Sequence, residues 1–318
     1  MSLVEYIPFY NIPSNTKTPS VICLGNFDGV HIGHAELIRE TVLMKESFDQ
    51  ARSAALCFSV LPANYFQKGK VKSIMSLEQK LDIFKSLGLD GAYVCDFGAL
   101  SSYSPERFIK EILFEECNCV GAVCGFNYSF GAKAVGTPET LKKIMLDNSR
   151  LFKMVDTVEL LNKTVSSSAI REYIQAGDFI SANLMLGRPF CISHEIIHGA
   201  NIGTKLGYPT INHIFSPEDD QIIPAFGIYA TKALINDRSY IGVTNIGVRP
   251  TVSDSGVITC ETHLINPVDS CDLYGNIAKV QFFKKLRNEQ KFNSLNDLSA
   301  AIAKDIENAK KFFCNQEG

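Results

Sequence analysis

The stretch with the clearest capacity for chemistry is residues 25–34, GNFDGVHIGH, which joins an apolar run to an amphipathic one. Three glycines within nine residues allow a tight turn and close approach of the backbone to a ligand. The first turn of the following helix presents unpaired N–H groups and the positive end of the helix dipole, which together bind phosphate. His31 and His34 project to one side of that turn, where imidazoles can donate to a nucleotide phosphate.

Plainer interpretations of the same residues exist. Two histidines three residues apart can be half of a metal site or part of a helix surface, and glycine-rich turns are common between strands and helices. The His-x-Gly-His pattern in a strand–loop–helix context is more specific than a lone GxGxxG pattern, and it favours a nucleotide site.

Two other segments carry groups that suit an anion. In VSSSAIR, residues 165–171, Ser166 and Ser167 begin a helix, and Arg171 with the nearby Lys163 could neutralise a pyrophosphate. GFNYSFG, residues 125–131, is a glycine-flanked loop with Asn127 as its polar member. Taken alone, the first segment equally describes a serine-capped helix and the second a turn.

The elements that must position these groups differ between the two halves of the chain. In the first half, apolar runs alternate with amphipathic stretches, which predicts a parallel sheet wound with helices. Ser76 suits an N-cap and Gly88 the position just after a helix. The expected strands are 21–24, 54–58, 92–95, 120–124 and 152–155, and the expected helices are 34–48, 76–88, 104–116 and 137–148.

In the second half the apolar period changes to two, as in 277–283, and glycine, proline, asparagine and aspartate separate the runs. This predicts a small antiparallel barrel or sandwich, with a domain boundary near Gly187. A closing helix carries an apolar stripe that we expect to cap the barrel rather than bind a partner. The stripe consists of Leu295, Leu298, Ile302, Ile306, Ala309 and Phe313.

Composition limits the possible functions. The 318 residues suit two domains at about 150 residues each, and 46% apolar residues can supply both cores. A net charge of −3 provides no basic field to collect nucleic acid or anionic lipid. Neither a signal peptide nor an apolar stretch of about 20 residues is present, so we expect an unexported, cytoplasmic protein without a membrane segment. The ten cysteines include no CxxC pair, which predicts reduced, buried thiols.

GNFDGVHIGH resembles the G-x-F-D-G-x-H-x-G-H signature of the nucleotidyltransferase superfamily, and in particular the bacterial bifunctional riboflavin kinase and FAD synthetase family. VSSSAIR is similar to the family segment I-S-S-T-x-I-R, which closes over the ATP phosphates, and GFNYSFG to a loop around adenine and flavin. LGRPF, HGANIGTKLGYPTIN, GIYA, NIGVRPT, ETHL and DLYG follow in the order found in riboflavin kinases, so the likeness covers almost the whole chain.

The resemblance implies an α/β nucleotidyltransferase domain of the Rossmann-like, HxGH type over residues 1–186. A small antiparallel β-barrel riboflavin kinase domain with a C-terminal helix would follow over 187–318. The implied reactions are phosphorylation of riboflavin to FMN and adenylylation of FMN to FAD with release of pyrophosphate. Both would use ATP as co-substrate and Mg²⁺ as cofactor.

The resemblance also assigns residues. Catalytic roles fall to His31 and His34 in the first half and to Glu261, as general base on the ribityl 5′-hydroxyl, in the second. Without the resemblance, an isolated Glu261 would be taken for a solvated strand residue. Thr210 and Asn212 would hold the metal, and Arg287 would lie near the flavin or simply on the surface. Nucleotide and phosphate binding falls to Gly25, Phe27, Asp28, Gly29, Gly33, Asn127, Lys163, Ser166, Ser167, Arg171, Gly203 and Gly207.

The chain departs from the family pattern at two positions of the first half. Leu61 stands where the family usually has histidine, and Ser129 where it often has arginine, so two polar or cationic groups are missing. One alternative is therefore a riboflavin kinase with a degenerate adenylyltransferase half, and another is a non-catalytic sensor of flavin or nucleotide. A sensor would need neither a base nor transition-state donors. The expected partners are small molecules only, and the sequence leaves the oligomeric state open.

Overall fold

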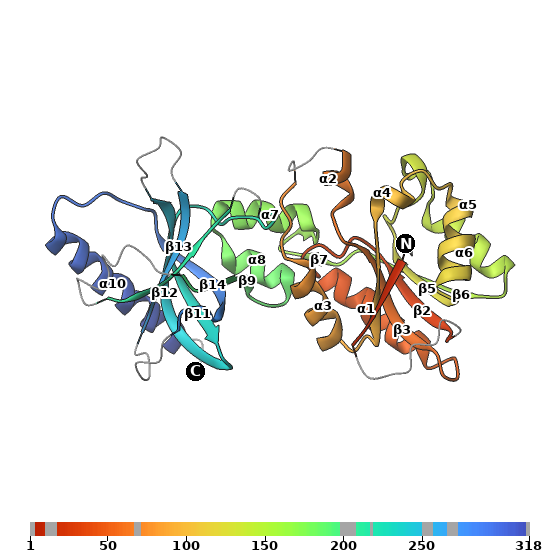
Figure 1. Ribbon diagram of the computed structural model, residues 1–318, viewed down its shortest axis with the longest axis horizontal. Coiled ribbons are helices and arrows are strands. Elements are labelled where there is room, and N and C mark those ends of the chain that lie inside the picture. The colour runs from red at the N-terminus through yellow and green to blue at the C-terminus, as the bar shows by residue number, and fades with distance from the viewer. Residues whose placement is uncertain are drawn as a thin grey trace. The chain divides into compact units, whose positions relative to one another are not determined.

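In this computed structural model the described residues are 4–9, 18–66, 71–197, 208–216, 219–249, 257–265 and 273–315. The chain forms two compact units, Met1–Ser167 and Ser168–Gly318, called here the N-terminal unit and the C-terminal unit. Figure 1 labels many of their helices and strands.

Within its described residues, the N-terminal unit contains a six-stranded sheet in the order β1-β4-β3-β2-β5-β6. The five strands after β1 run parallel, and β1 pairs antiparallel with β4 at one edge. The chain order reverses between β2 and β5, as in doubly wound α/β folds. The strands are β1 (Val4–Pro8), β2 (Ser20–Leu24), β3 (Arg52–Phe58), β4 (Gly91–Cys95), β5 (Cys119–Gly125) and β6 (Leu151–Val155).

Helices cover both faces of this sheet because its strand side chains alternate between two apolar clusters. Leu37, Ile38 and Phe84 of α1 and α3 pack with Cys23 and Ala55 on one face. The helices η1 and α6 pack on the opposite face. The helices of this unit are α1 (Ile32–Lys45), α2 (Pro62–Phe66), α3 (Leu77–Ser86), α4 (Phe97–Leu100), α5 (Pro105–Arg107), the π-helix η1 (Phe108–Glu116), the 3₁₀-helix η2 (Ala132–Ala134) and α6 (Pro138–Asp147).

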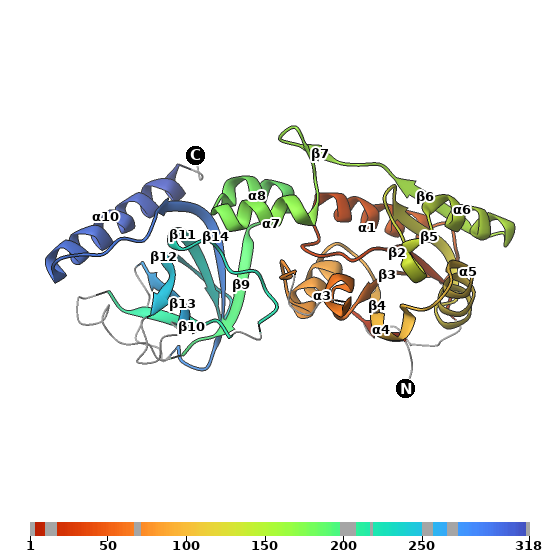
Figure 2. The same ribbon diagram turned by 90° about the horizontal axis from the view of Figure 1, so that it is seen from above.

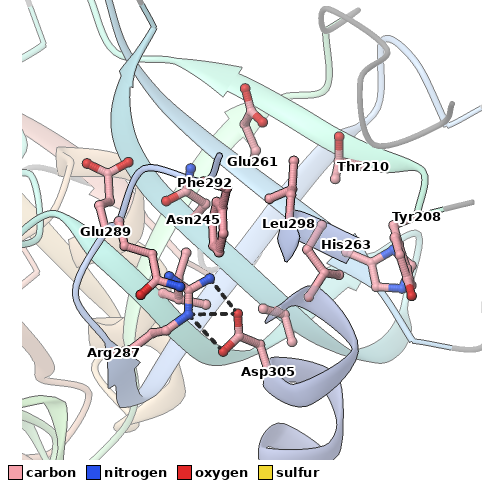
Figure 3. A pocket seen from close by; sticks show the side chains of 14 residues that line it. Tyr208, Thr210, Asn245, Glu261, His263, Arg287, Glu289, Phe292, Leu298 and Asp305 are labelled. Atoms are coloured by element: carbon pink, nitrogen blue, oxygen red, sulfur yellow. Dashed lines mark hydrogen bonds and ion pairs between the residues drawn. The ribbon is translucent and has the colours of Figure 1, made fainter. Parts of the chain in front are cut away.

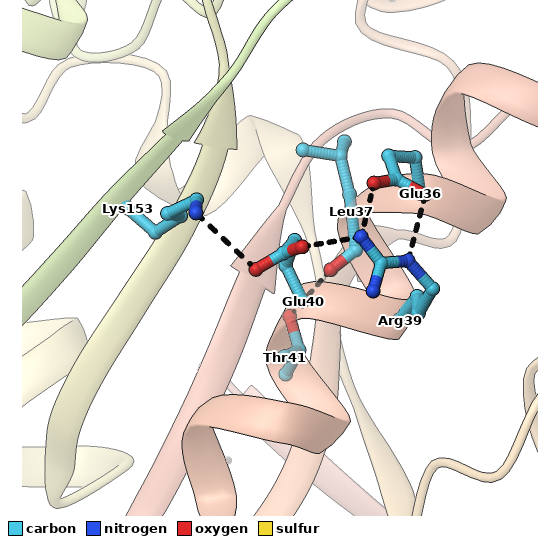
Figure 4. A network of polar contacts seen from close by, with 6 residues as sticks. All are labelled: Glu36, Leu37, Arg39, Glu40, Thr41 and Lys153. Atoms are coloured by element: carbon cyan, nitrogen blue, oxygen red, sulfur yellow. Dashed lines mark hydrogen bonds and ion pairs between the residues drawn. The ribbon is translucent and has the colours of Figure 1, made fainter.

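Helix α1 matters most for function because residues 25–34 lead into it. Its exposed face carries ion pairs from Arg39 to Glu36 and Glu40, both at 2.5 Å, and Glu40 reaches Lys153 of β6 at 3.5 Å (Figure 4). Exposed pairs of this kind contribute at most about 1 kcal/mol each. The buried Leu37 and Ile38 therefore supply most of the energy that fixes the helix.

The C-terminal unit contains, within its described residues, a six-stranded antiparallel sheet in the order β10-β13-β12-β11-β14-β9. A bridge between Ile197 and Asn212 joins its two edges, with Ile197 N–H donating to the Asn212 carbonyl at 3.0 Å, so the sheet curls round on itself. The strands are β9 (Phe190–Glu195), β10 (Thr210–Ile214), β11 (Gly227–Ile235), β12 (Arg238–Arg249), β13 (Val257–Leu264) and β14 (Ile277–Arg287), and a small hairpin, β7 (Glu159–Leu160) and β8 (Lys163–Thr164), ends the preceding unit.

Helix α10 (Leu295–Cys314) lies along this sheet (Figure 2). Its last turns bury Ala309 and Phe313 against Ile228, Ala230 and Val243. The expected capping of the sheet by this helix is therefore confirmed for that part of its apolar stripe.

The helices α7 (Ser167–Ala176) and α8 (Phe179–Leu186) pack with the C-terminal unit. The Phe179 ring stacks on Phe190 and contacts Tyr229 and Phe282, and Asn183 bonds the backbone of both β9 and β14. Packing thus divides the chain two helices before the boundary expected near Gly187, a residue that ends α8 in a left-handed conformation.

The expected strands and main helices are present, with Ser76 capping α3 and Gly88 at φ +89° just after it. The cysteines of the described residues are free, and most are buried, as expected. Neither β1 nor the π-helical register of η1, in which the Cys117 N–H donates to the Ile112 carbonyl, was predicted from the sequence.

Candidate functional site

The first candidate site lies where strand order reverses in the N-terminal unit. Strands β2 and β5 pair in parallel, with Leu24 opposite Cys124, so the loops that follow them emerge side by side. These loops are residues 25–31 and 125–131, the two motifs that sequence analysis placed around a nucleotide. Open α/β sheets bind ligands in this position, at the carboxyl ends of the strands.

The backbone of residues 25–31 is unusually constrained. Phe27, Gly29 and Val30 have φ values of +50°, +80° and +36°, in the left-handed region that residues other than glycine rarely adopt. Phe27 and Val30 are nevertheless buried, at 0% and 1% exposure. Strained conformations of this kind are characteristic of functional loops.

The two histidines are held together at the start of α1. His31 is its N-cap, and its Nδ1 accepts a hydrogen bond from His34 N–H at 3.3 Å. A neutral His31 therefore carries its proton on Nε2, which makes that atom a donor. The two rings stack with centroids 3.7 Å apart, which confirms that they share one side of the helix. A Cβ on Gly33 would lie 3.2 Å from the His31 ring, so glycine makes room for this stack.

Asp28 and Ser167 tie the loop to its surroundings. The Asp28 carboxylate is buried and accepts from Ile74 N–H at 2.9 Å, just ahead of α3. The Ser167 hydroxyl donates to the Asp28 carbonyl at 2.8 Å, which brings the serine segment against the glycine-rich loop. Part of the predicted phosphate site is therefore assembled by bonds within the protein.

The other predicted residues of this half are more exposed. Asn127 lies exposed in the loop after β5, with Ser129 beside it, and Lys163 is exposed on β8. Ser166 is half-buried just before α7, and Arg171 lies half-buried on α7, in the C-terminal unit. Leu61 immediately precedes α2 after β3.

The second candidate site lies on the curled sheet. In its register Asn212 of β10 and Asn245 of β12 both stand opposite Glu261 of β13, and Thr210 stands opposite His263. Paired residues of an antiparallel sheet share a face, so these side chains gather on one side. Asn212 is only 5% exposed, and its Nδ2 donates to the Thr210 carbonyl at 3.0 Å.

A cavity of about 310 Å³ opens on this face, between the sheet and α10 (Figure 3). It brings together the predicted residues Thr210, Glu261 and Arg287, which are far apart in the sequence. Its full lining is Tyr208, Thr210, Ile228, Val243, Asn245, Glu261, His263, Arg287, Glu289, Gln290, Phe292, Leu298, Ile302 and Asp305.

Arg287 is fixed rather than free on the surface. Its Nε and Nη2 donate to the Asp305 carboxylate at 3.0 and 2.8 Å, and the carboxylate is 5% exposed (Figure 3). This fork attaches α10 to β14 and holds a cationic group in the cavity wall.

Two further polar groups of the cavity, Glu289 and Asn245, were not predicted from the sequence. Burial raises the pKa of the Glu289 carboxyl, a shift that Asn245 and Arg287 partly oppose. The Asn245 Oδ1 is buried and has no hydrogen-bond partner among the described residues. NIGVRPT contained this asparagine, but only the strand register shows that it faces Glu261. Gly203 and Gly207, predicted to bind phosphate, lie outside the described residues.

Both halves of the chain match known protein families. Residues 14–169 match the family model described as FAD synthetase, and residues 186–313 match the one described as riboflavin kinase. The bifunctional riboflavin kinase/FMN adenylyltransferase of Bacillus subtilis is 33% identical over 310 residues, which span 96% of each chain. The chain belongs to the bifunctional riboflavin kinase/FMN adenylyltransferase family.

The likeness extends to other members and to a solved structure. The protein of the same name from Escherichia coli strain K12 is 31% identical over 318 residues, covering 98% of both chains. A crystal structure described as a macrolide-efflux protein from Streptococcus pneumoniae superposes with a TM-score of 0.83 at 27% identity, over 93% of this chain and 95% of that one.

Membership of the riboflavin kinase/FMN adenylyltransferase family confirms the resemblance seen in the sequence motifs. Because both domain models match, the bifunctional interpretation is favoured over a kinase with a degenerate first half and over a sensor. Among the described residues, no helix combines the length and apolar character that a membrane span requires.

Proposed function

We propose that this chain makes flavin cofactors in two ATP-dependent steps, one in each half. Riboflavin receives a phosphoryl group and becomes FMN, and FMN then receives AMP and becomes FAD with release of pyrophosphate. One observation carries the proposal: each unit has its own polar site, the His31–His34 stack in one and the Glu261 cavity in the other. The identity with enzymes named for both activities supports it.

In the adenylyl transfer, an FMN phosphate oxygen attacks the α-phosphorus of ATP and the bond to pyrophosphate breaks. The Nε2–H of His31, together with His34 and the N–H groups at the start of α1, stabilises the charge that develops on the α-phosphate oxygens. Asn127 contacts the adenine. The backbone comes close to the nucleotide at Gly25, Phe27, Asp28, Gly29 and Gly33. The leaving pyrophosphate is bound by Lys163, Ser166, Ser167 and Arg171.

In the kinase step, the ribityl 5′-hydroxyl oxygen attacks the γ-phosphorus of ATP while Glu261 accepts its proton. Arg287, held by Asp305, contacts the flavin from the cavity wall. Gly203 and Gly207 belong to the proposed phosphate loop.

The residues at the proposed metal position fit Mg²⁺. Thr210 and Asn212 carry hydroxyl and amide oxygens on one face of β10, and hard oxygen donors suit this ion. No cluster of three or more His, Cys, Asp and Glu side chains that could hold a metal occurs in the described part of the chain. When bound, Mg²⁺ would neutralise phosphate charge, and Thr210 and Asn212 would hold it beside the nucleotide.

The proposal also covers the fold class of each half, the location of the protein and its partners. The first half is a Rossmann-like nucleotidyltransferase of the HxGH type and the second a riboflavin kinase β-barrel. The proposed functional boundary stays at 186/187, although α7 and α8 pack with the second unit. The strand order around β2 and β5 and the curled antiparallel sheet support these classes. The free cysteines support a cytoplasmic location, and the partners are small molecules rather than nucleic acid or membrane.

A crossed pair of variants tests the assignment. His34→Ala removes a donor to the α-phosphate and should slow FAD formation by about 10²- to 10³-fold while leaving FMN formation intact. Glu261→Gln keeps the size of the side chain but accepts no proton, so FMN formation should fall by about 10²- to 10⁴-fold while supplied FMN still becomes FAD. Wild-type FMN formation by Glu261→Gln, or wild-type FAD formation by His34→Ala, would overturn the respective role.

A further inference from the structure

Lys80 of α3 is the only lysine among the described residues that is fully buried, at 5% exposure. A capping box made by Ser76 and Gln79 fixes the start of α3, and Lys80 follows on its first turn. Lysine side chains are rarely buried unless a partner compensates the charge. The surroundings of Lys80 must therefore contain a group that compensates its charge.

The ammonium of Lys80 points into the loop that carries the histidines. Its Nζ donates to the Asn26 carbonyl oxygen at 3.1 Å. It also lies close enough to the Cys57 thiol to favour the thiolate, although burial raises the pKa of Cys57 overall. Asn26 follows β2 and Cys57 is near the end of β3, so the charge sits at the carboxyl ends of two adjacent strands.

Within the described ranges, no carboxylate lies within ion-pair distance of Lys80. On the same loop, the Asp28 carboxylate accepts a hydrogen bond from Ile74 N–H. A buried cation whose described partner is a single neutral carbonyl leaves a large part of its charge uncompensated. An anion bound at the adjacent loop would supply that compensation.

The hydrogen bond also orients the loop. A trans peptide directs its C=O and N–H in opposite directions, so drawing the Asn26 carbonyl toward Lys80 turns the Phe27 N–H away from it. Phe27 is the first residue of the loop with positive φ. Lys80 therefore fixes the orientation of the peptide that precedes this strained residue.

We propose that Lys80 is a positioning residue of the adenylyltransferase half, which fixes the Asn26–Phe27 peptide and supplies buried positive charge for the polyphosphate chain of the nucleotide. This inference rests on the proposed function. The positive charge comes from Lys80 of α3, which contacts the loop of residues 25–31 at Asn26.

Lys80→Met tests the proposal, because it keeps most of the side-chain length and removes the charge. Lys85→Met, at an exposed position of the same helix, is the matched control. FAD formation from supplied FMN isolates the adenylyltransferase half, and competition against ATP by pyrophosphate, AMP and adenosine varies the charge of the inhibitor. We expect Lys80→Met to raise the KM for ATP and the inhibition constant of pyrophosphate at least tenfold, to affect AMP less, and to leave adenosine within twofold.

Equal weakening of adenosine and pyrophosphate would show a merely structural lysine, and values within twofold of wild type would overturn the proposal outright. Lys80→Arg keeps the charge and should recover part of the ATP affinity. If Lys80→Met proves unfolded by circular dichroism, Lys80→Gln replaces it, because its amide can still donate to the Asn26 carbonyl but carries no charge. Inhibition of Lys80→Gln by pyrophosphate within twofold of wild type would contradict the proposal.

Calorimetric titration of ATP into the full chain distinguishes a failure of this inference from a failure of the proposed function on which it rests. Wild type should show two binding steps, and Lys80→Met should weaken one of them at least tenfold. A wild-type chain that makes no FAD refutes the adenylyltransferase function, whereas unchanged ATP binding in Lys80→Met refutes the role of Lys80.

Discussion

Asp28 offers the sharpest prediction about how the nucleotide loop is held. Its carboxylate accepts from the N–H of Ile74, a residue that is 1% exposed, so the bond is shielded from bulk water. Replacing Asp28 by alanine removes this acceptor from the buried N–H. The same substitution frees the loop from the segment that precedes α3.

The contact with the Ile74 N–H sets the smallest cost to be expected. A buried donor left without a partner costs about 1–3 kcal/mol. If the loop relaxes from its positive-φ conformation to recover this energy, productive adenylyl transfer falls by roughly five- to 150-fold, at about 1.4 kcal/mol per factor of ten. The kinase step draws on the other unit and should not change.

The assay is FAD formation from supplied FMN, with FMN formation from riboflavin measured in the same preparation. Asp28→Asn is the matched control, since its Oδ1 can still accept from Ile74 N–H, and it should lose less than Asp28→Ala. Retention of FAD formation within twofold by Asp28→Ala would refute the argument that this bond holds the loop. A parallel fall in FMN formation would refute its restriction to one half.

Two further predictions concern the C-terminal unit. A fragment beginning at Ser168 should fold and phosphorylate riboflavin. A fragment beginning at Leu184 lacks Phe179, so its free energy of unfolding should be lower by about 3–5 kcal/mol. Equal thermal midpoints of the two fragments by circular dichroism would contradict this. Burial lowers the pKa of His213 to about 4, so the unfolded state binds its proton first as pH falls below 6.5. Stability against urea should therefore be complete above pH 6.5 and decline toward pH 4, and a His213→Gln variant with an equally steep decline would exclude His213 as the cause.

The sequence predicted the fold wherever the pattern is local. Apolar runs such as 21–24 and 54–58 are buried on both faces of a parallel sheet, so their composition alone marks them. Strand β1 escaped notice because it is a short edge strand ending in Pro8, where apolar pattern is weak. The packing of α7 and α8 was not predicted, because it depends on residues such as Tyr229 that are distant in the sequence.

The candidate sites, like the fold, were predictable only where the pattern is local. His31 and His34 were predictable because their spacing along one helix turn fixes their proximity. The fork between Arg287 and Asp305 was not, since it depends on how α10 crosses β14. Lys80 looked like an ordinary polar position on an amphipathic helix, and only its burial against Asn26 distinguishes it.

The most direct test of the central claim is a product analysis of the purified full-length chain. Riboflavin, ATP and Mg²⁺ are incubated with the protein, and riboflavin, FMN and FAD are separated over time. We predict that FMN appears first and FAD follows, with pyrophosphate formed in step with FAD. Accumulation of FMN alone would contradict the adenylyltransferase half, and the absence of both products would contradict the account as a whole.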